Sequence, residues 1–290
     1  MSWRTVVISS RAKLDYHAGF LVVRAEETKR LFLKDIEILV IESTAVSMTA
    51  YLLNELVKHK VRVVFCDEKR NPTSELQPLY GSHDTSLKVR NQIAWSDTIK
   101  ESVWTEIVTE KIRKQAELLR KYNKPQAELL YSYIGEILPG DVTNREGHAA
   151  KVYFNALWGN TFSRSEECPV NAALNYGYAI ILSMFNREIT CNGYLTQFGL
   201  FHDNMFNAFN LSSDLMEPFR PIVDEFVLEL RPEKFEENEK RELLKLLTKI
   251  VIIQERKEYL PNAVGHYVRS VFDALSEGDI ANIRFYRNEL

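Results

Sequence analysis

The stretch CPVNAALNYGYAIILSMFN, residues 168–186, contains no charged side chain. Its length suggests a membrane span, but Pro169 and Asn175 are poor residues to expose to lipid. Between residues 168 and 201 the only charged positions are Arg187 and Glu188. A surface helix needs a polar face, so the pattern predicts a helix at the buried centre of a helical domain, and no membrane span is expected.

The sequence around this stretch has a hydrophobic period of about 3.6 residues from position 93 onward, which is typical of amphipathic helices. Val103, Ile107 and Ile112 fit a first helix of this kind. Further helices are predicted at 125–137, 144–158, 170–186 and 195–209, then as a pair over 226–253, and again at the C-terminal end.

Residues 1–80 follow a different period. Short runs rich in β-branched residues predict strands at 5–9, 13–17, 20–25, 36–43 and 61–67. One amphipathic helix interrupts them, with Ser47 as its N-cap and with Leu52 and Leu56 on its inner face. The predicted fold class is α+β: a small N-terminal β-rich domain over 1–80, a linker over 81–92, and a larger all-α domain over 93–290.

Two of the predicted strands, TVVIS and IEILVIES, are strongly apolar. A domain of about 80 residues buries its surface poorly by itself. We therefore expect these strands to contribute to a homodimer interface.

The composition excludes several classes of protein. The net charge of −3 means that any contact with nucleic acid must come from basic residues gathered on one face. Cys66, Cys168 and Cys191 form no CxxC pair, which argues against a structural zinc site or a disulfide framework and favours the reducing cytoplasm. The sequence lacks a GxxxxGK[ST] phosphate loop, a GxGxxG motif, a GxSxG elbow and an HExxH motif.

The segment TNREGHAAKVYFNALWG, residues 143–159, contains the first candidate acid. Thr143 and Glu146 have the spacing of a capping box, which is the simpler interpretation. Glu146 also shares a helical face with Tyr153 and other large apolar side chains. A carboxylate on such a buried face needs a cation or a metal as its partner. His148 is predicted to be exposed.

The segment GLFHDNMFNAFNLSSDLMEPFRP, residues 199–221, contains a histidine and further acids in apolar surroundings. On one straight helix, His202 and Glu217 would be about 22 Å apart. The polar NLSSD run is expected to break the helix, so that the chain reverses and His202 faces Asp214 and Glu217. Alternatively, the two acids cap a helix and His202 is an ordinary core residue.

Glu146, His202 and a second acid would combine oxygen ligands with one imidazole. This set favours Mg²⁺ or Mn²⁺ over zinc, and an open site of this kind suits phosphodiester chemistry. The residues therefore predict a metal-dependent enzyme that acts on phosphate. Replacing Glu217 by Gln is expected to raise the melting temperature of the metal-free protein, because a buried acid without its metal is unfavourable.

Four segments occur in the order NREGHAAKVYFNALWG, PVNAALNYGYAIILSMFNREI, GLFH and SSDLMEPFRPIVDEFV, and together they closely resemble the CRISPR-associated integrase that captures new spacers. The resemblance covers nearly the whole chain and is greatest to members from type II-A systems. It implies an N-terminal β domain followed by a helical catalytic domain. It also implies that Glu146, His202 and Glu217 are the catalytic residues and the metal ligands. Asp214 is then either an alternative ligand or a supporting, helix-capping group.

The resemblance further implies a reaction and its partners. The 3′-hydroxyl end of a protospacer DNA attacks the CRISPR repeat by transesterification, and DNA endonuclease activity accompanies this reaction. The implied partners are protospacer and leader-repeat DNA, a second copy of the chain, and the small CRISPR adaptation subunit in a heterohexamer. Type II-A membership adds an accessory DNA-end-binding protein and the effector nuclease. Two alternatives stay open: a plain metal-dependent DNA nuclease, and a non-catalytic dimeric scaffold that presents DNA.

Basic residues near these helices are candidates for DNA binding. Arg145, Lys151 and Arg220 flank the predicted ligands, where positive charge would act on the scissile phosphate; Arg220 could instead pair with a nearby acid. A second group lies on one helix of mixed charge, and its alternative interpretation is a solvated face compensated by Glu110 and Glu117. Its members are Lys111, Arg113, Lys114, Arg120, Lys121 and Lys124.

Overall fold

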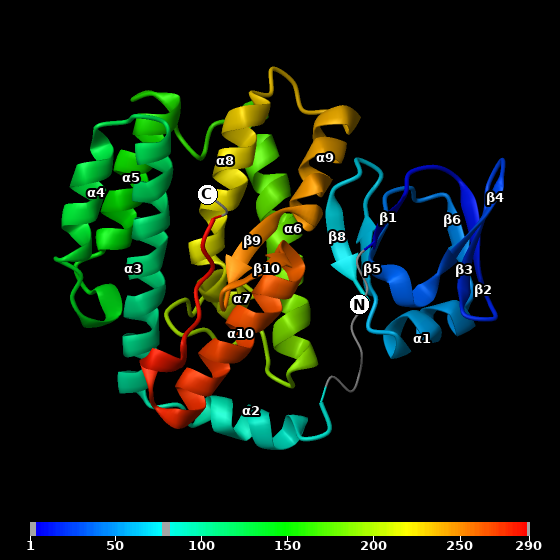
Figure 1. Cartoon of the computed structure of the whole chain (residues 1–290), viewed down its shortest axis with the longest axis horizontal. Coiled ribbons are helices and arrows are strands. Elements are labelled where there is room, and N and C mark those ends of the chain that lie inside the picture. Colours follow the sequence, from blue (N-terminus) through cyan, green and yellow to red (C-terminus); the bar gives the residue numbers. More distant parts are fainter. Residues whose placement is uncertain (1–3, 77–81, 289–290) are drawn as a thin grey trace. The chain divides into compact units, whose positions relative to one another are not determined.

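A strand-rich part precedes a mainly helical part in the computed structural model of this chain (Figure 1). The structure describes residues 4–76 and 82–288. The chain forms two compact units, Met1–Leu79 and Tyr80–Leu290. The order of elements confirms the α+β class that the change in hydrophobic period predicts.

Within its described residues, the N-terminal unit contains two four-stranded sheets. The first has the order β1-β5-β7-β8, with β1, β5 and β7 parallel and β8 antiparallel to its neighbour. Its strands are β1 (Arg4–Ile8), β5 (Ile36–Ile41), β7 (Arg62–Cys66) and β8 (Pro72–Glu75). The second sheet has the order β4-β3-β2-β6 and consists of β4 (Thr28–Phe32), β3 (Phe20–Arg24), β2 (Ala12–His17) and β6 (Val46–Met48).

Some details of this unit differ from the prediction. Helix α1 (Ala50–Lys58) is capped by Thr49, whose hydroxyl accepts a hydrogen bond from the backbone N–H of Leu52 at 3.2 Å, while Ser47 lies in β6. Strand β4 is missing from the predicted set, because its exposed residues do not alternate between apolar and polar. Strand β5 is buried along almost its whole length, whereas four of the five residues of β1 are half-buried, and the homodimer interface stays a prediction.

The C-terminal unit is built around α6 (Pro169–Cys191), which confirms the predicted buried helix. Its close packing against α8 requires Gly177, because a Cβ atom at this position would lie 2.4 Å from Cγ1 of Val223. The other α-helices of the described part of this unit are α2 (Thr85–Ile93), α3 (Asp97–Lys121), α4 (Gln126–Ile134), α5 (Arg145–Trp158), α7 (Asn210–Leu215), α8 (Arg220–Leu230), α9 (Glu237–Leu243) and α10 (Leu260–Glu277).

Two predictions for this part of the chain are corrected. The segment 81–92, expected to be a linker, contains most of α2. The unit is not all-α, because β9 (Ile250–Ile253) and β10 (Arg256–Tyr259) form an antiparallel hairpin where a helix is predicted. The run KIVII favours a strand, and Gln254 and Glu255 both have positive φ values, as a tight two-residue hairpin turn requires.

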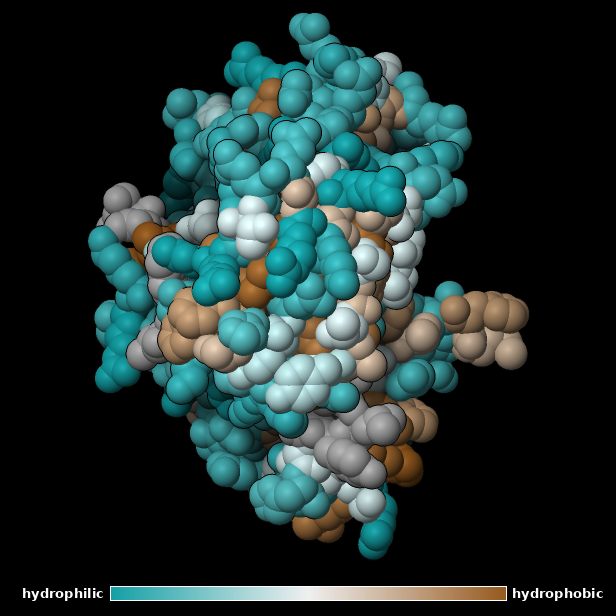
Figure 2. Space-filling view, turned by 90° about the vertical axis from the view of Figure 1, so that its right-hand side faces the viewer, coloured by the Kyte–Doolittle hydropathy of each residue, from teal (hydrophilic) through white to brown (hydrophobic). Residues whose placement is uncertain are grey.

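No helix in residues 4–76 or 82–288 is long and apolar enough to cross a membrane. The face of the molecule in Figure 2 is mostly hydrophilic, and its hydrophobic residues are scattered among polar ones.

Candidate active site and metal centre

Helix α3 places Lys111 inside the C-terminal unit. Lys111 lies four residues after Ile107 and seven before Leu118, on the apolar face of the helix, and its side chain is only 7% exposed. Its ammonium donates hydrogen bonds to the carboxylates of Glu146 and Glu217. Two of the three predicted metal ligands therefore meet at one buried positive charge.

Glu146 reaches this point from the first turn of α5. Asn144 caps the helix in the left-handed conformation, with a φ of 53°, and its side-chain oxygen accepts a hydrogen bond from the N–H of Gly147 at 3.2 Å. The carboxylate of Asp141 accepts a hydrogen bond from the N–H of Glu146 at 3.0 Å. The capping box predicted from Thr143 is therefore wrong. Asn144 and Asp141 cap the helix, so the side chain of Glu146 is available to contact α3.

Glu217 begins the 3₁₀ turn Glu217–Phe219, which joins α7 to α8. It is 5% exposed, and its Oε1 accepts a hydrogen bond from Nε of Arg220 at 2.9 Å while its Oε2 contacts Lys111. Burial by itself would raise the pKa of Glu217, but the charges of Arg220 and Lys111 outweigh burial and lower this pKa to about 2. Glu217 is therefore ionised at neutral pH.

The pKa of Lys111 responds to the same contacts. Burial by itself would lower this pKa, but Glu217 and Glu146 outweigh burial and raise it above its ordinary value. A buried ammonium is tolerated here because two carboxylates bind it.

The helix predicted over 195–209 is wrong. Residues 192–209 contain only turns, bends and irregular backbone, and NLSSD belongs to the start of α7 and does not break a helix. The side-chain oxygen of Asn204 accepts a hydrogen bond from the N–H of Phe206 at 2.9 Å, and that of Asn207 does the same for Phe209 at 2.9 Å. Such local side-chain bonds compete with helix formation. Several large apolar side chains in this loop are exposed: Phe198, Phe201, Met205, Phe206 and Phe209.

Gly199 allows this loop to turn tightly before His202. A Cβ atom at position 199 would lie 2.2 Å from the backbone oxygen of His202 and 2.8 Å from Oδ2 of Asp214. A side chain at position 199 would collide with these atoms, so the glycine three residues before His202 is required by steric crowding. This role of Gly199 was not predicted from the sequence.

Asp214 holds the loop from within α7. Its Oδ2 accepts hydrogen bonds from the backbone N–H groups of Leu200 at 2.6 Å and Phe201 at 3.1 Å. Its Oδ1 accepts one from the N–H of His202 at 3.2 Å and also contacts Nδ1 of the His202 ring. Asp214 therefore supports the loop and the histidine and does not cap a helix, and it is fully buried.

His202 is partly exposed, with 43% of its side chain accessible, and its ring packs edge-on against Trp104 with centroids 5.8 Å apart. The hydrogen bond to Asp214 raises the pKa of His202, and partial burial opposes this effect. The charges of Glu217 and Glu146 raise the same pKa further.

The predicted ligands offer carboxylate oxygens and one imidazole nitrogen, which are ligand types that a hard divalent ion accepts. Glu146 and Glu217 direct oxygen atoms at one cation, and His202 is the imidazole of the predicted set. Among the residues that the structure describes, no three His, Cys, Asp or Glu side chains form a group that could hold a metal ion. In the structure, the ammonium of Lys111 is the positive charge that the two carboxylates share.

The candidate DNA-binding residues differ in exposure. Lys111 and Lys114 are buried, so neither lies on the exposed face that DNA binding or the alternative of a solvated face requires. Lys114 pairs with Glu110 at 3.3 Å and with Glu117 at 2.9 Å. Arg145 pairs with Glu136 at 2.7 Å. The remaining candidates are at least partly exposed: Arg113, Arg120, Lys121, Lys124, Lys151 and Arg220.

Asp224 is a buried acid close to this centre that the sequence motifs did not predict. Asp224 is 1% exposed and accepts hydrogen bonds from the hydroxyl of Tyr153, at 2.9 Å, and from that of Tyr178. Burial raises the pKa of Asp224 to about 6, although the hydroxyl groups and Arg220 oppose this rise. Asp224 lies one helical turn after Arg220 in an otherwise apolar stretch of helix, and this position in the sequence indicates a buried acid.

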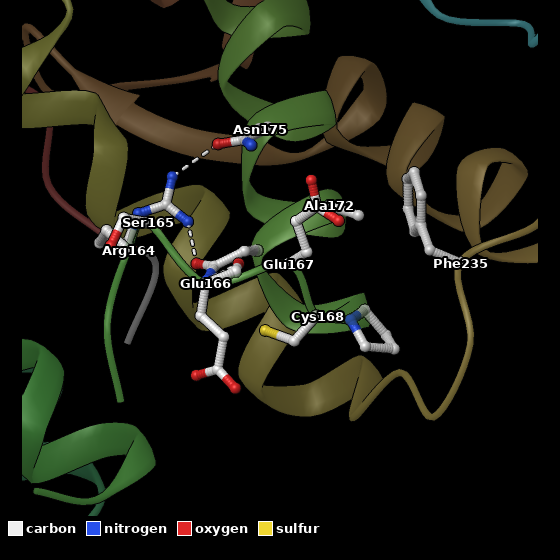
Figure 3. Close-up of a pocket in the computed structure, with 10 residues that line it drawn as sticks. Arg164, Ser165, Glu166, Glu167, Cys168, Ala172, Asn175 and Phe235 are labelled. Carbon is white, nitrogen blue, oxygen red and sulfur yellow. Dashed lines mark hydrogen bonds between the residues drawn. The ribbon is translucent and has the colours of Figure 1, made fainter. Parts of the chain in front are cut away.

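The pocket in Figure 3 lies at the start of α6 and has a volume of about 470 Å³. Its lining includes Arg164, Cys168 and Phe235, and it contains none of the predicted site residues. Arg164 points toward Asn175 and donates a hydrogen bond to its side-chain oxygen at 2.7 Å (Figure 3). This pocket is separate from the set of residues around Lys111.

Comparison with known proteins identifies relatives along most of the chain. The family described as "CRISPR associated protein Cas1" matches residues 5–257. The CRISPR-associated endonuclease Cas1 of Neisseria meningitidis is 36% identical over 233 residues, which cover 79% of this chain and 76% of that protein.

Solved structures share the fold. A casposase bound to an integration product has a TM-score of 0.76 and 17% identity, over 97% of this chain and 92% of that chain. A chain of a Cas6-RT-Cas1–Cas2 complex has a TM-score of 0.73 and 16% identity, over 97% of this chain but only 36% of that longer chain.

Proposed function

Because the chain belongs to the family of CRISPR-associated Cas1 proteins, we propose that it is a metal-dependent DNA integrase of CRISPR adaptation. It joins the 3′-hydroxyl ends of protospacer DNA to the CRISPR repeat, and it also cleaves DNA. The name of the Neisseria relative supports the nuclease activity, and the fold shared with a casposase supports the joining activity.

One observation carries the proposal. Glu146 and Glu217 come from elements far apart in the chain, and both carboxylates contact one buried positive charge. The charges of both acids also raise the pKa of His202. Two carboxylates and an imidazole are donors that Mg²⁺ and Mn²⁺ accept.

The reaction exchanges one phosphodiester for another. The 3′ oxygen of the protospacer forms a bond to a phosphorus atom of the repeat, and the bond from this phosphorus to the 3′ oxygen of the neighbouring nucleotide breaks. A bound Mg²⁺ or Mn²⁺ would lower the pKa of the attacking hydroxyl and neutralise charge on the attacked phosphate. Because one ester replaces another, no nucleotide cofactor is required.

The residues of the chain have separate roles in this proposal. Glu146, Glu217 and the imidazole of His202 would hold the ion. Asp214 fixes the His202 ring through Nδ1, as partners of metal-binding histidines commonly do. Arg220 compensates the charge of Glu217 and keeps its carboxylate in place.

We further propose that the chain acts as a homodimer together with the small adaptation subunit, on protospacer and leader-repeat DNA in the cytoplasm. The Cas1–Cas2 complex among the structural neighbours supports this partner. Two attack positions, one at each end of a repeat, require two active sites at a fixed distance, which an assembly of dimers supplies.

A joining assay tests the proposal. Purified protein with the adaptation subunit and Mn²⁺ is incubated with a supercoiled plasmid that carries a leader and repeat, and with donors that end in 3′-hydroxyl or 3′-phosphate. We expect joined product only from the 3′-hydroxyl donor. Equal plasmid nicking with both donors and no joined product would identify a plain nuclease. Full activity of Glu146→Gln would instead identify a scaffold whose acids take no part in the chemistry.

A further inference from the structure

Lys111 connects three parts of the C-terminal unit through one nitrogen atom. It is 35 residues before Glu146 and 106 residues before Glu217, and its ammonium contacts both carboxylates. The side chains of Lys111 and Glu217 are each 7% exposed, so water screens their interaction little.

This geometry places Lys111 in competition with a metal ion. Two carboxylates that contact one nitrogen have oxygen atoms arranged around a single point, and a divalent ion held by both must lie near that point. An ammonium and a divalent cation repel each other strongly at such short range. The lysine stem has four flexible carbons, so the ammonium can leave without any movement of α3.

We propose that Lys111 is an internal counter-ion that competes with the divalent metal for Glu146 and Glu217. It keeps the two carboxylates together in the metal-free protein, and it leaves them when the ion enters. The inference rests on the proposed function, because it takes Glu146 and Glu217 as metal ligands.

Lys114 provides a matched control. It lies on the same helix one turn later, its side chain is 4% exposed, and it also pairs with two carboxylates, those of Glu110 and Glu117. Lys114→Met therefore removes an equally buried ammonium from α3 without changing the contacts of Glu146 or Glu217.

The experiment measures Mn²⁺ binding to the full-length protein without DNA, by titration calorimetry and by the electron paramagnetic resonance signal of free Mn²⁺. We expect Lys111→Met to lower the Kd for Mn²⁺ by about tenfold or more, since the competing charge is gone. Lys111→Arg, which keeps the charge, should bind Mn²⁺ no more tightly than the wild type. Lys114→Met should stay within about twofold of the wild type, a change of less than 1 kcal/mol. An unchanged or weaker Mn²⁺ affinity of Lys111→Met overturns the inference.

The wild-type protein supplies a second measurement that does not depend on the folding of a variant. Modification of lysines by an amine-reactive reagent is quantified by mass spectrometry, with and without saturating Mn²⁺. Displacement predicts that modification of Lys111 rises at least severalfold with Mn²⁺, while that of Lys114 does not change. Unchanged modification of Lys111 contradicts displacement.

The outcomes separate this inference from the proposed function. If neither the wild type nor any variant binds Mn²⁺, or if Glu146→Gln binds it as well as the wild type does, the proposed metal site is wrong. If the wild type binds Mn²⁺, Glu146→Gln does not, and Lys111→Met binds more weakly, only the competition is wrong.

Discussion

The carboxylate of Asp214 binds Nδ1 of His202, a residue twelve positions earlier in the chain. The same carboxylate accepts hydrogen bonds from three consecutive backbone N–H groups of the loop that contains this histidine. One buried acid therefore shapes the loop and orients the ring. Because the carboxylate of Asp214 accepts a hydrogen bond from Nδ1–H, the lone pair of neutral His202 lies on Nε2, the atom left for an ion or a substrate.

Replacing Asp214 by Asn should lower the pKa of His202, because the hydrogen bond with the carboxylate is the largest cause that raises it. We also expect a loss of roughly 1–3 kcal/mol in the free energy of unfolding, since buried N–H groups lose a charged acceptor. The titration is followed by the NMR signal of the ring Cε1–H, and stability by urea unfolding. An unchanged titration midpoint would show that Asp214 does not control the ring.

Replacing Glu217 by Gln should lower the melting temperature of the metal-free protein. This reverses the expectation from sequence, which treated Glu217 as an acid without a partner, whereas Lys111 and Arg220 both bind it. Breaking a buried ion pair costs roughly 3–5 kcal/mol. Glu128→Gln is the control, because its pair with Arg120 is exposed and should contribute less than about 1 kcal/mol.

The contribution of Glu217 should also depend on pH in a defined direction. Its folded-state pKa is lowered from 4.5 to about 2, so its stabilisation is complete above pH 4.5 and is lost as the pH falls toward 2. The difference in melting temperature between wild type and Glu217→Gln should shrink over this interval. A constant difference from pH 5 to the lowest pH at which both proteins fold would contradict the assigned charge state.

Replacing Gly199 by Ala should destabilise the protein by roughly 1–3 kcal/mol and abolish joining, because the added Cβ collides with the backbone oxygen of His202. Gly135→Ala is the matched control, since its Cβ would meet nothing closer than 3.7 Å. Chemical unfolding and the joining assay are measured on both variants. If Gly199→Ala keeps full activity and stability, the loop does not require the tight turn.

The contribution of Asp224 to stability should depend on pH in the opposite direction to that of Glu217. Its folded-state pKa is raised from 3.8 to about 6, so its stabilisation is complete below pH 3.8 and is lost as the pH rises through 6. This difference in pKa corresponds to roughly 3 kcal/mol. The stability of wild type relative to Asp224→Asn should fall by an amount of this order between pH 4 and pH 7, as measured by urea unfolding. A relative stability that rises with pH would contradict the shift.

The amino-acid sequence was sufficient for the parts of the fold that depend on local patterns. The uncharged run before Arg187 predicted the buried helix α6, and the change of hydrophobic period predicted a strand-rich part followed by a helical one. The hydrophobic period also places Lys111 on the apolar face of α3, four residues after Ile107. A charged residue on an apolar face indicates a buried partner of opposite charge. Lys111 was instead predicted to lie on a face that contacts DNA or is exposed to solvent.

Local patterns failed where side chains compete with the backbone. The apolar residues of 195–209 favour a helix, but Asn204 and Asn207 bind nearby N–H groups and stabilise turns. The hairpin β9–β10 was not predicted for a related reason. Gln254 and Glu255 have positive φ values in its turn, but Gln and Glu are not residue types that indicate such a turn.

The sequence by itself determined the family: the ordered motifs that contain Glu146, His202 and Glu217 resemble those of Cas1 proteins, and the Cas1 family matches residues 5–257. Only the tertiary structure decided what each of these three residues contacts. Lys111 meets a carboxylate 106 residues away, and Asp214 serves the histidine loop instead of a helix end. The physical reason is that hydrophobic period and capping motifs report contacts within a few residues. Pairing between distant charged groups depends on how α3, α5 and the turn at Glu217 pack together, and burial then makes that pairing necessary.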